Sequence, residues 1–186
     1  MRIVAGKFRG KNLVAPDGKN TRPTSDRARE SVFNVLDSKL RRDAIMWDSL
    51  VVADVFAGTG ALGAEALSRG ATELFAWEKD AAAVKCFKQN LAAFEQNGAK
   101  VTLYSDALTP VLARSPVDLL FMDPPDAKGL VAPALTALRA RGWIDGKTRC
   151  VVEIADGEKD VLPPEFEIVD SRAYGKARVL FARLNG

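Results

Sequence analysis

The chain has no histidine, only two cysteines and no long apolar run. Without histidine it cannot contain a Ser-His-Asp triad or a Cys-His nucleophile. Cys86 and Cys150 are distant in sequence, and two cysteines cannot supply the four thiolate or imidazole ligands of a structural zinc site. No segment approaches the ~20 apolar residues of a membrane span, and the N-terminus lacks the apolar core of a signal peptide. We therefore expect a cytoplasmic protein that uses no metal and has no membrane partner.

The composition is that of an ordinary soluble domain, but the charge is unevenly distributed. At 186 residues, 47% hydrophobic and 27% charged, the chain suits one well-buried domain. The net charge is +3, yet residues 1–30 hold eight basic and three acidic side chains. The basic ones are Arg2, Lys7, Arg9, Lys11, Lys19, Arg22, Arg27 and Arg29. Such a segment is typical of a polyanion-binding surface, and the alternative is an arm that only keeps the protein soluble.

Apolar segments of strand length alternate with helical segments. Strands are expected at 51–56, 73–77, 101–104, 117–122 and 150–154, with helical segments between them, notably 61–69, 81–97 and 130–141. A first helix is expected at about 27–40, after a short hairpin within 2–15. Strands 166–172 and 177–184 are too close for anything but an antiparallel hairpin. The pattern predicts an α/β fold with a doubly wound, mostly parallel seven-stranded sheet closed by that hairpin.

The expected strand that ends at Phe56 leads into a glycine turn and a helix. Gly58, Gly60 and Gly63 have the spacing G-x-G-x-x-G, and Glu78 follows Gly58 by twenty residues at the end of the next strand. In sites for adenosine-containing cofactors, the glycines allow close approach of the backbone and the acid binds the ribose hydroxyls. Strand, turn, helix, strand and acid in this order favour such a site over an ordinary tight turn.

The charge of Asp54 bears on which cofactor is bound. Asp54 lies four residues before Gly58, near the carboxyl end of the first expected strand. At that position its side chain would face a bound ligand. A carboxylate there repels a pyrophosphate and attracts the ammonium and sulfonium groups of S-adenosylmethionine (SAM), which favours SAM over NAD. The alternative is that Asp54 binds backbone amides of the following loop, which is compatible with either cofactor.

A second motif, Asp123-Pro124-Pro125-Asp126, directly follows the apolar run 117–122. The two prolines cannot extend a strand ladder, so they fix the backbone in an extended shape and remove two N–H donors. The Asp123 carboxylate and neighbouring carbonyl oxygens then form a row of acceptors, which suits an amino group with two N–H bonds. Taken alone, the motif is equally typical of a turn that ends a strand.

Several segments together resemble the RsmD-type 16S rRNA guanine-N2 methyltransferases. The resemblance rests on 1–11 (MRIVAGKFRGK), 21–30 (TRPTSDRARE), 54–63 with 65–71, and Asp123-Pro124-Pro125, and it covers nearly the whole chain. It implies a Rossmann-like class I methyltransferase domain at 25–186 behind a basic arm or hairpin at 1–24. It also implies a monomer that acts on 16S rRNA, within the small ribosomal subunit or its assembly intermediate. SAM would be the methyl donor and S-adenosylhomocysteine the product.

The resemblance also assigns the site residues. The catalytic group would be Asp123, Pro124, Pro125 and Asp126. The cofactor would bind Asp54, Phe56, Ala57, Gly58, Gly60, Leu62, Glu78, Lys79, Asp106 and Ala107, with Glu78 on the ribose and Asp106 and Ala107 at the adenine. The RNA would contact Arg2, Lys7, Phe8, Arg9, Lys11, Arg22 and Thr24, with Phe8 available for stacking.

The sequence departs from this family at Asp126, where an aromatic residue is usual. A carboxylate at this position would accept the guanine N1–H and so favour guanine over adenine. The competing interpretation is that Asp126 faces solvent and another side chain stacks on the base. Three other functions stay open: a DNA adenine-N6 methyltransferase, an NAD-linked oxidoreductase and a non-catalytic SAM-binding module. The basic arm and the lack of a separate target-recognition domain favour RNA over DNA.

Overall fold

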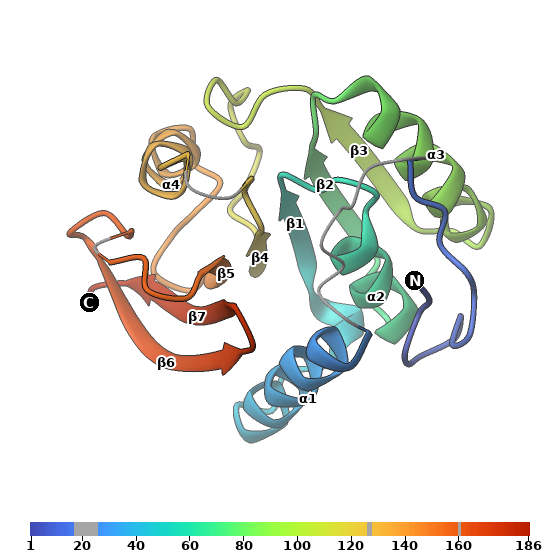
Figure 1. The fold of residues 1–186 in the computed structure, drawn as a ribbon, viewed down its shortest axis with the longest axis horizontal. Coiled ribbons are helices and arrows are strands. Elements are labelled where there is room, and N and C mark those ends of the chain that lie inside the picture. The colour runs from blue at the N-terminus through green and yellow to red at the C-terminus, as the bar shows by residue number, and fades with distance from the viewer. Residues whose placement is uncertain (17–25, 126–127, 160) are drawn as a thin grey trace.

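The computed structural model describes residues 1–16, 26–125, 128–159 and 161–186. Seven strands form one sheet in the order β3-β2-β1-β4-β5-β7-β6 (Figure 1). The elements are α1 (Asp26–Arg42), the 3₁₀ helix η1 (Trp47–Ser49), β1 (Val51–Val55), α2 (Ala61–Arg69), β2 (Glu73–Trp77), α3 (Ala81–Gln96), β3 (Lys100–Tyr104), β4 (Leu119–Met122), α4 (Val131–Ala140), β5 (Arg149–Ala155), β6 (Phe166–Tyr174) and β7 (Ala177–Leu184). The predicted α/β sheet is thereby confirmed.

The centre of the sheet is parallel and buried. Strand β1 pairs with β2 on one side and with β4 on the other, so that Ala53 lies between Phe75 and Leu120. All four residues of β4 are buried, as is usual for a parallel strand with both faces covered. The chain runs outward from β1 to β3 and then returns to β4. The switch point, where ligands of open α/β sheets bind, therefore lies between β1 and β4.

The C-terminal strands run the other way. Strand β7 pairs antiparallel with β5 and with β6, and the register of β6 and β7 shifts between Ile168 and Asp170. The turn between β6 and β7 therefore lies beside the carboxyl end of β5, where Ala177 pairs with Ala155. The expected hairpin is confirmed, and it places its turn on the same edge of the sheet as the carboxyl ends of the parallel strands.

Each face of the sheet has its own hydrophobic core. Helices α1, α2 and α3 cover one face, where Phe33, Leu67 and Phe87 pack with sheet residues such as Phe121. Helix α4 and Trp143 cover the other face, packing on residues such as Leu120. Phe121 and Leu120 are neighbours in β4, so the alternation of side chains along a strand divides the two cores.

The connection from β3 to β4 differs from the expected alternation of strands and helices. Residues 105–118 form no helix. Two prolines, Pro110 and Pro116, interrupt this stretch, and the backbone instead bonds to the chain after α4. The Val117 N–H donates to the Trp143 carbonyl at 3.0 Å, and the Trp143 indole Nε1–H donates to the Val111 carbonyl at 2.8 Å.

The N-terminal segment, residues 1–16, packs against the helices. An antiparallel bridge joins Arg2 to Asn12, which confirms a short hairpin. Ile3 and Leu13 belong to the core under α1, α2 and α3. At Gly6, with φ +79°, an added Cβ would lie 1.9 Å from the Ser68 carbonyl oxygen, so only glycine allows this approach. The segment is thus built into the domain rather than suspended from it.

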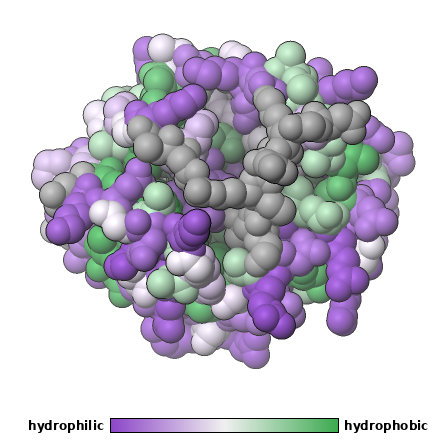
Figure 2. All heavy atoms as spheres, in the orientation of Figure 1, coloured by the Kyte–Doolittle hydropathy of each residue, from purple (hydrophilic) through white to green (hydrophobic). Residues whose placement is uncertain are grey.

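None of the helices in the described ranges is long and apolar enough to cross a membrane. Hydrophilic side chains predominate over the face seen in Figure 2, with apolar side chains scattered between them. The chain ends lie apart, with the N-terminus beside α2 and the C-terminus on the side of α4 (Figure 1).

Candidate active site

Four acidic residues lie at the carboxyl edge of the parallel strands, as the sequence predicts. Asp54 is the penultimate residue of β1, Glu78 follows β2 directly, Asp106 comes two residues after β3 and Asp123 follows β4. Parallel strands bring their carboxyl ends to one edge, so these four residues meet along one rim of the sheet at the switch point. The four carboxylates differ in their burial and in their hydrogen-bond partners.

The glycine loop after β1 is tightly wound. Phe56, Gly58 and Gly60 all have positive φ, at 61°, 56° and 79°, and the Gly60 N–H donates to the Ala57 carbonyl at 2.8 Å. A Cβ on Gly60 would lie 2.7 Å from side-chain atoms of Phe87 and Leu91, whereas a Cβ on Gly58 would meet nothing within 4 Å. Gly60 is therefore required by packing, while Gly58 borders open space.

Glu78 ties the glycine loop to β2. Its Oε2 accepts the Gly58 N–H at 2.8 Å, and its Oε1 accepts the backbone N–H groups of Lys79 and Asp80 at 2.8 and 2.7 Å. An ionised carboxylate has about four acceptor positions, so Oε2 keeps capacity for one further donor such as a ribose hydroxyl. Glu78 thus holds the loop in place and still suits its expected role.

Asp54 does not face the rim as its position suggested. Its side chain is 1% exposed, and its Oδ2 accepts the Gly63 N–H at 2.9 Å inside the first turn of α2. Burial, and next the nearby charge of Glu78, raise the pKa of Asp54 to about 7. The structure therefore shows the loop-binding alternative, and the preference for SAM cannot rest on an exposed charge at Asp54.

The remaining cofactor candidates lie along the same edge. Asp106 accepts the Leu108 N–H at 2.9 Å, and Ala107 beside it is buried. Leu62 is half-buried in the first turn of α2, and Lys79 is exposed after β2. Eight of the ten predicted cofactor contacts therefore lie in the segments that follow β1, β2 and β3, whereas Leu62 belongs to the first turn of α2 and Asp54 is buried within β1.

Asp123 lies at the same edge of the sheet, at the end of β4 and thus on the opposite side of β1 from β2. Its N–H donates to the Val55 carbonyl at 3.3 Å, which extends the pairing of β4 with β1 by one residue. The Asp123 residue is exposed, Pro124 is half-buried and Pro125 is exposed. Asp126 lies outside the described residues. The predicted acceptor group is therefore held directly against the strand that carries the glycine loop.

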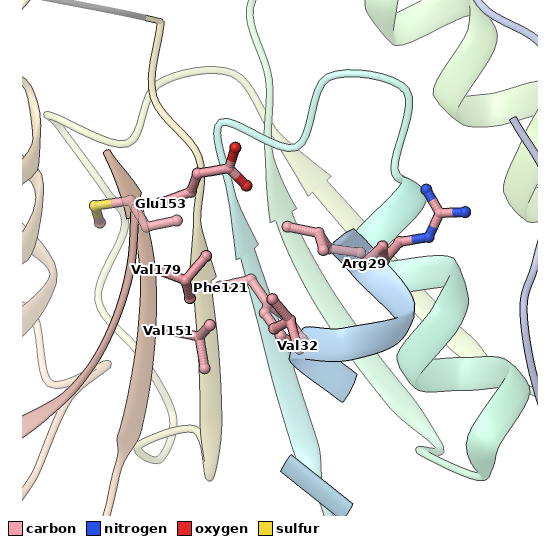
Figure 3. A pocket seen from close by; sticks show the side chains of 8 residues that line it. Arg29, Val32, Phe121, Val151, Glu153 and Val179 are labelled. Carbon is pink, nitrogen blue, oxygen red and sulfur yellow. The ribbon is translucent and has the colours of Figure 1, made fainter. Parts of the chain in front are cut away.

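An apolar pocket lies beside Asp123, between α1, the start of α2 and strands β4, β5 and β7 (Figure 3). Its apolar walls are Val32, Leu62, Phe121, Met122, Val151 and Val179. Arg29 and Glu153 also line it, and neither was singled out from the sequence as a site residue. A carboxylate in the middle of the alternating strand 149–155 was the signal available for Glu153.

The basic N-terminal residues are only partly near this rim. The Lys7 Nζ donates to Asn97 Oδ1 at 3.1 Å, and the Phe8 ring packs on Phe94 with 4.4 Å between centroids. Phe94 lies in the last turn of α3 and Asn97 directly follows this helix. The start of α3 lies at the carboxyl edge of the sheet, so these two contacts lie at the opposite edge. Phe8 is therefore engaged in packing rather than presented for base stacking.

The other candidate RNA contacts are more accessible. Arg2 and Arg9 are exposed and Lys11 is half-buried. Arg2 lies at the start of α1, 3.8 Å from the Asp26 carboxylate, and thus on the rim side of the molecule. Arg22 and Thr24 lie outside the described residues. The structure therefore distributes the basic side chains over the molecule instead of gathering them at Asp123.

A buried ionic cluster that sequence reasoning missed anchors the N-terminal segment. Glu65, with no exposed surface, accepts the N–H groups of Val4 and Ala5 at 2.9 and 3.0 Å and the Arg69 Nε–H at 3.1 Å. The Arg29 guanidinium lies 3.9 Å from it. The signal was a glutamate within the otherwise apolar helix 61–68, since a charge is buried only when it is paired.

Asn90 provides a similar anchor near the glycine loop. Its side chain accepts the Val14 N–H at 2.8 Å and donates to the Thr59 carbonyl at 2.9 Å. One buried amide therefore joins the N-terminal segment, α3 and the glycine loop. Among the described residues no group of three or more Cys, Asp or Glu side chains is placed to hold a metal ion.

The chain is similar to known methyltransferases along most of its length. It is 36% identical over 154 residues to "Ribosomal RNA small subunit methyltransferase D" of Escherichia coli strain K12, covering 82% of this chain and 74% of that protein. The protein of the same name from Haemophilus influenzae is 29% identical over 179 residues, covering 94% of this chain and 89% of that one.

Solved structures agree with this relationship. A structure titled "Putative methyltransferase yhhF from Escherichia coli" matches with a TM-score of 0.80 and 30% identity, covering 99% of this chain and 97% of that one. A Thermus hypothetical protein, TTHA0928, matches with a TM-score of 0.76 and 27% identity over 99% of both chains. The predicted class I methyltransferase fold is thereby confirmed. Residues 1–183 match the family described as Conserved hypothetical protein 95, and the chain belongs to this RsmD-like family.

Proposed function

We propose that the protein transfers a methyl group from SAM to the exocyclic N2 of a guanine in small-subunit ribosomal RNA. The observation that carries this proposal is the position of Asp123-Pro124, bonded through Asp123 N–H to Val55 at the start of the glycine loop. Amine acceptors and a nucleotide-type loop therefore adjoin each other. The relatives named as small-subunit rRNA methyltransferases supply the class of substrate.

The glycine loop and the acids beside it fit SAM. Gly58 has a positive φ and borders open space. Because it has no side chain, a ligand can come into direct contact with the backbone at this residue. Glu78 keeps one acceptor position for a ribose hydroxyl, and Asp106 with Ala107 would adjoin the adenine. When bound, SAM supplies an electrophilic methyl group on a sulfonium.

Asp123 and Pro124 would act on the target amine. The guanine N2 lone pair is delocalised into the ring, which makes this nitrogen a poor nucleophile. Acceptance of its two N–H bonds by the Asp123 carboxylate and the Pro124 carbonyl favours a pyramidal nitrogen and directs the lone pair. The same acceptors stabilise the positive charge that grows on nitrogen, and positioning lowers the barrier further.

The RNA would reach this site as an unpaired or flipped nucleotide. A base inside a helix cannot bring its amino group to Asp123, so it must be unstacked first. The exposed Arg2 and Arg9 and the half-buried Lys11 would bind phosphates around it. We expect a cytoplasmic monomer acting on 16S rRNA in the small subunit or its assembly intermediate.

Methyl transfer from radiolabelled SAM to total RNA, DNA and small-subunit particles tests the proposal. The expected product is N2-methylguanosine in small-subunit rRNA. N6-methyladenine in DNA would instead establish the alternative methyltransferase. Calorimetry should show micromolar binding of SAM and S-adenosylhomocysteine and no binding of NAD. Tight binding of NAD without binding of SAM would overturn the proposal.

A further inference from the structure

Glu153 stands next to Asp123 on the neighbouring strand. Strands β4 and β5 are parallel and in register, with Phe121 beside Val151 and Met122 beside Val152. One residue further along, the same register sets Asp123 beside Glu153. Neighbouring strands lie about 4.8 Å apart, so the two carboxylates belong to one small area of the rim.

The Glu153 side chain lies on the pocket face of the sheet. Val151 lines the pocket, and Glu153, two residues later in the same strand, lines it too. Figure 3 shows the Glu153 carboxylate beyond the apolar side chains of Val151, Val179 and Phe121, while the Arg29 guanidinium points away from it. The pocket thus combines apolar walls with a carboxylate at its rim end.

The opposite wall connects this pocket to the cofactor loop. Leu62, in the first turn of α2, follows Gly60 by two residues and lines the pocket together with Met122, which immediately precedes Asp123. A planar base in contact with these apolar side chains would therefore lie between the glycine loop and the two carboxylates.

We propose that Glu153 accepts the N1–H of the target guanine and determines the specificity for guanine. This rests on the proposed function. Guanine carries its N1–H directly beside the N2 amino group, so acceptors at Asp123 and Glu153 match two adjacent donors. An ionised carboxylate only accepts, whereas adenine presents a lone pair at N1. Glu153, rather than Asp126, then carries the discrimination between purines.

The test uses 2-aminopurine, which keeps the 2-amino group but has an acceptor at N1. The substrate is 16S rRNA whose methylated nucleotide, mapped with the wild-type protein, is replaced by guanine or 2-aminopurine through ligation. The wild-type protein should prefer guanine by about 10- to 100-fold in kcat/KM, as expected for one hydrogen bond to a charged group. In Glu153→Gln this preference should fall below about threefold, because the amide donates or accepts.

A matched control is Glu167→Gln on β6, whose carboxylate is exposed and bonded to Arg183. It should keep the wild-type preference, and both variants should bind SAM as the wild type does. Glu153→Asp, which keeps an acceptor, should prefer guanine with reduced kcat/KM. If folded Glu153→Gln retains the wild-type preference, or if Glu153→Asp loses it, the proposal is wrong. If the wild type methylates no guanine in RNA, the proposed function itself fails.

Discussion

The two sides of the carboxyl edge use their acidic residues differently. On the cofactor side, after β1, β2 and β3, the side chains of Asp54, Glu78 and Asp106 each accept at least one backbone N–H of their own loops. On the substrate side, Asp123 is exposed at the end of β4, and Glu153 lies beside an apolar pocket. The carboxylates after β1, β2 and β3 bind backbone N–H groups of the glycine loop and its neighbours, whereas Asp123 and Glu153 lie at an exposed strand end and beside an apolar pocket.

Under the proposed function, this difference follows from what each side would bind. A small cofactor must be oriented by a rigid loop, and backbone hydrogen bonds to the carboxylates of Asp54, Glu78 and Asp106 provide that rigidity. A nucleotide within a large RNA brings its own donors, so acceptors aimed at it must remain reachable until it arrives. The comparison predicts that substitutions on the cofactor side reduce folding stability, while substitutions on the substrate side reduce turnover.

The largest expected effect concerns Glu65, which joins the N-terminal segment to the cofactor side. Glu65→Ala should lower the free energy of unfolding by about 3–5 kcal/mol, because it removes a fully buried carboxylate that accepts the Arg69 Nε–H and two half-buried backbone N–H groups. Urea denaturation measures this loss. Glu95→Ala, at an exposed position of α3, is the control and should change stability little. A loss below 1 kcal/mol for Glu65→Ala would contradict the anchoring role.

Asp123 tests the substrate side. Asp123→Ala should reduce kcat by about 10²- to 10³-fold, since an acceptor that strengthens as charge develops acts on the transition state. Asp123→Asn should also be slow, because a neutral amide balances positive charge poorly. Single-turnover methyl transfer measures the rate, and calorimetry should show unchanged SAM affinity. The exposed Asp48→Ala is the control; a wild-type rate in Asp123→Ala would exclude this residue from catalysis.

Asp54 tests whether burying a carboxylate on the cofactor side makes the folding stability depend on pH. Its pKa is raised from 3.8 to about 7 in the folded protein, so the folded state holds a proton that the unfolded state releases. Stability should therefore fall as the pH rises from about 4 to about 7, by at most about 4 kcal/mol at 1.36 kcal/mol per pH unit. Asp54→Asn should remove this slope in urea titrations between pH 4 and pH 8. An unchanged slope would assign the pH dependence elsewhere.

The smallest effect is expected from Arg9 and Lys11, the two cations of the N-terminal hairpin, which belong to neither side of the rim. Reversal of Arg9 and Lys11 to Glu should weaken rRNA binding by about tenfold and reduce its salt dependence, because fewer counterions are released. SAM affinity should not change. Deletion of residues 1–16 is a poor substitute, since it removes Ile3 and Leu13 from the core. Equal RNA affinity and equal salt slope in the reversed protein would show that these cations do not bind RNA.

Much of the fold was predictable because its signals are local. The glycine spacing, the apolar strands and the proline pair each dictate backbone shape within a few residues, and they located the loops that carry the rim. The expected alternation of strands and helices was wrong between β3 and β4, because the backbone hydrogen bonds of this stretch are made with Arg141 and Trp143, far away in sequence. No window of neighbouring residues contains that information.

By itself, the sequence determined the kind of sheet, the family and the four acids that follow or end its strands, since strands and helices follow from hydrophobic spacing and helical crossovers imply parallel pairing. Only the tertiary structure decided what each acid does. It buried Asp54 against Gly63, bound Glu78 to Gly58, left Asp123 exposed and paired the neighbouring Met122 with Val152, the residue before Glu153. The burial of each carboxylate and its hydrogen-bond partners depend on helices that come from elsewhere in the chain. Burial and hydrogen bonding in turn determine whether a carboxylate is ionised and whether it can accept a further hydrogen bond.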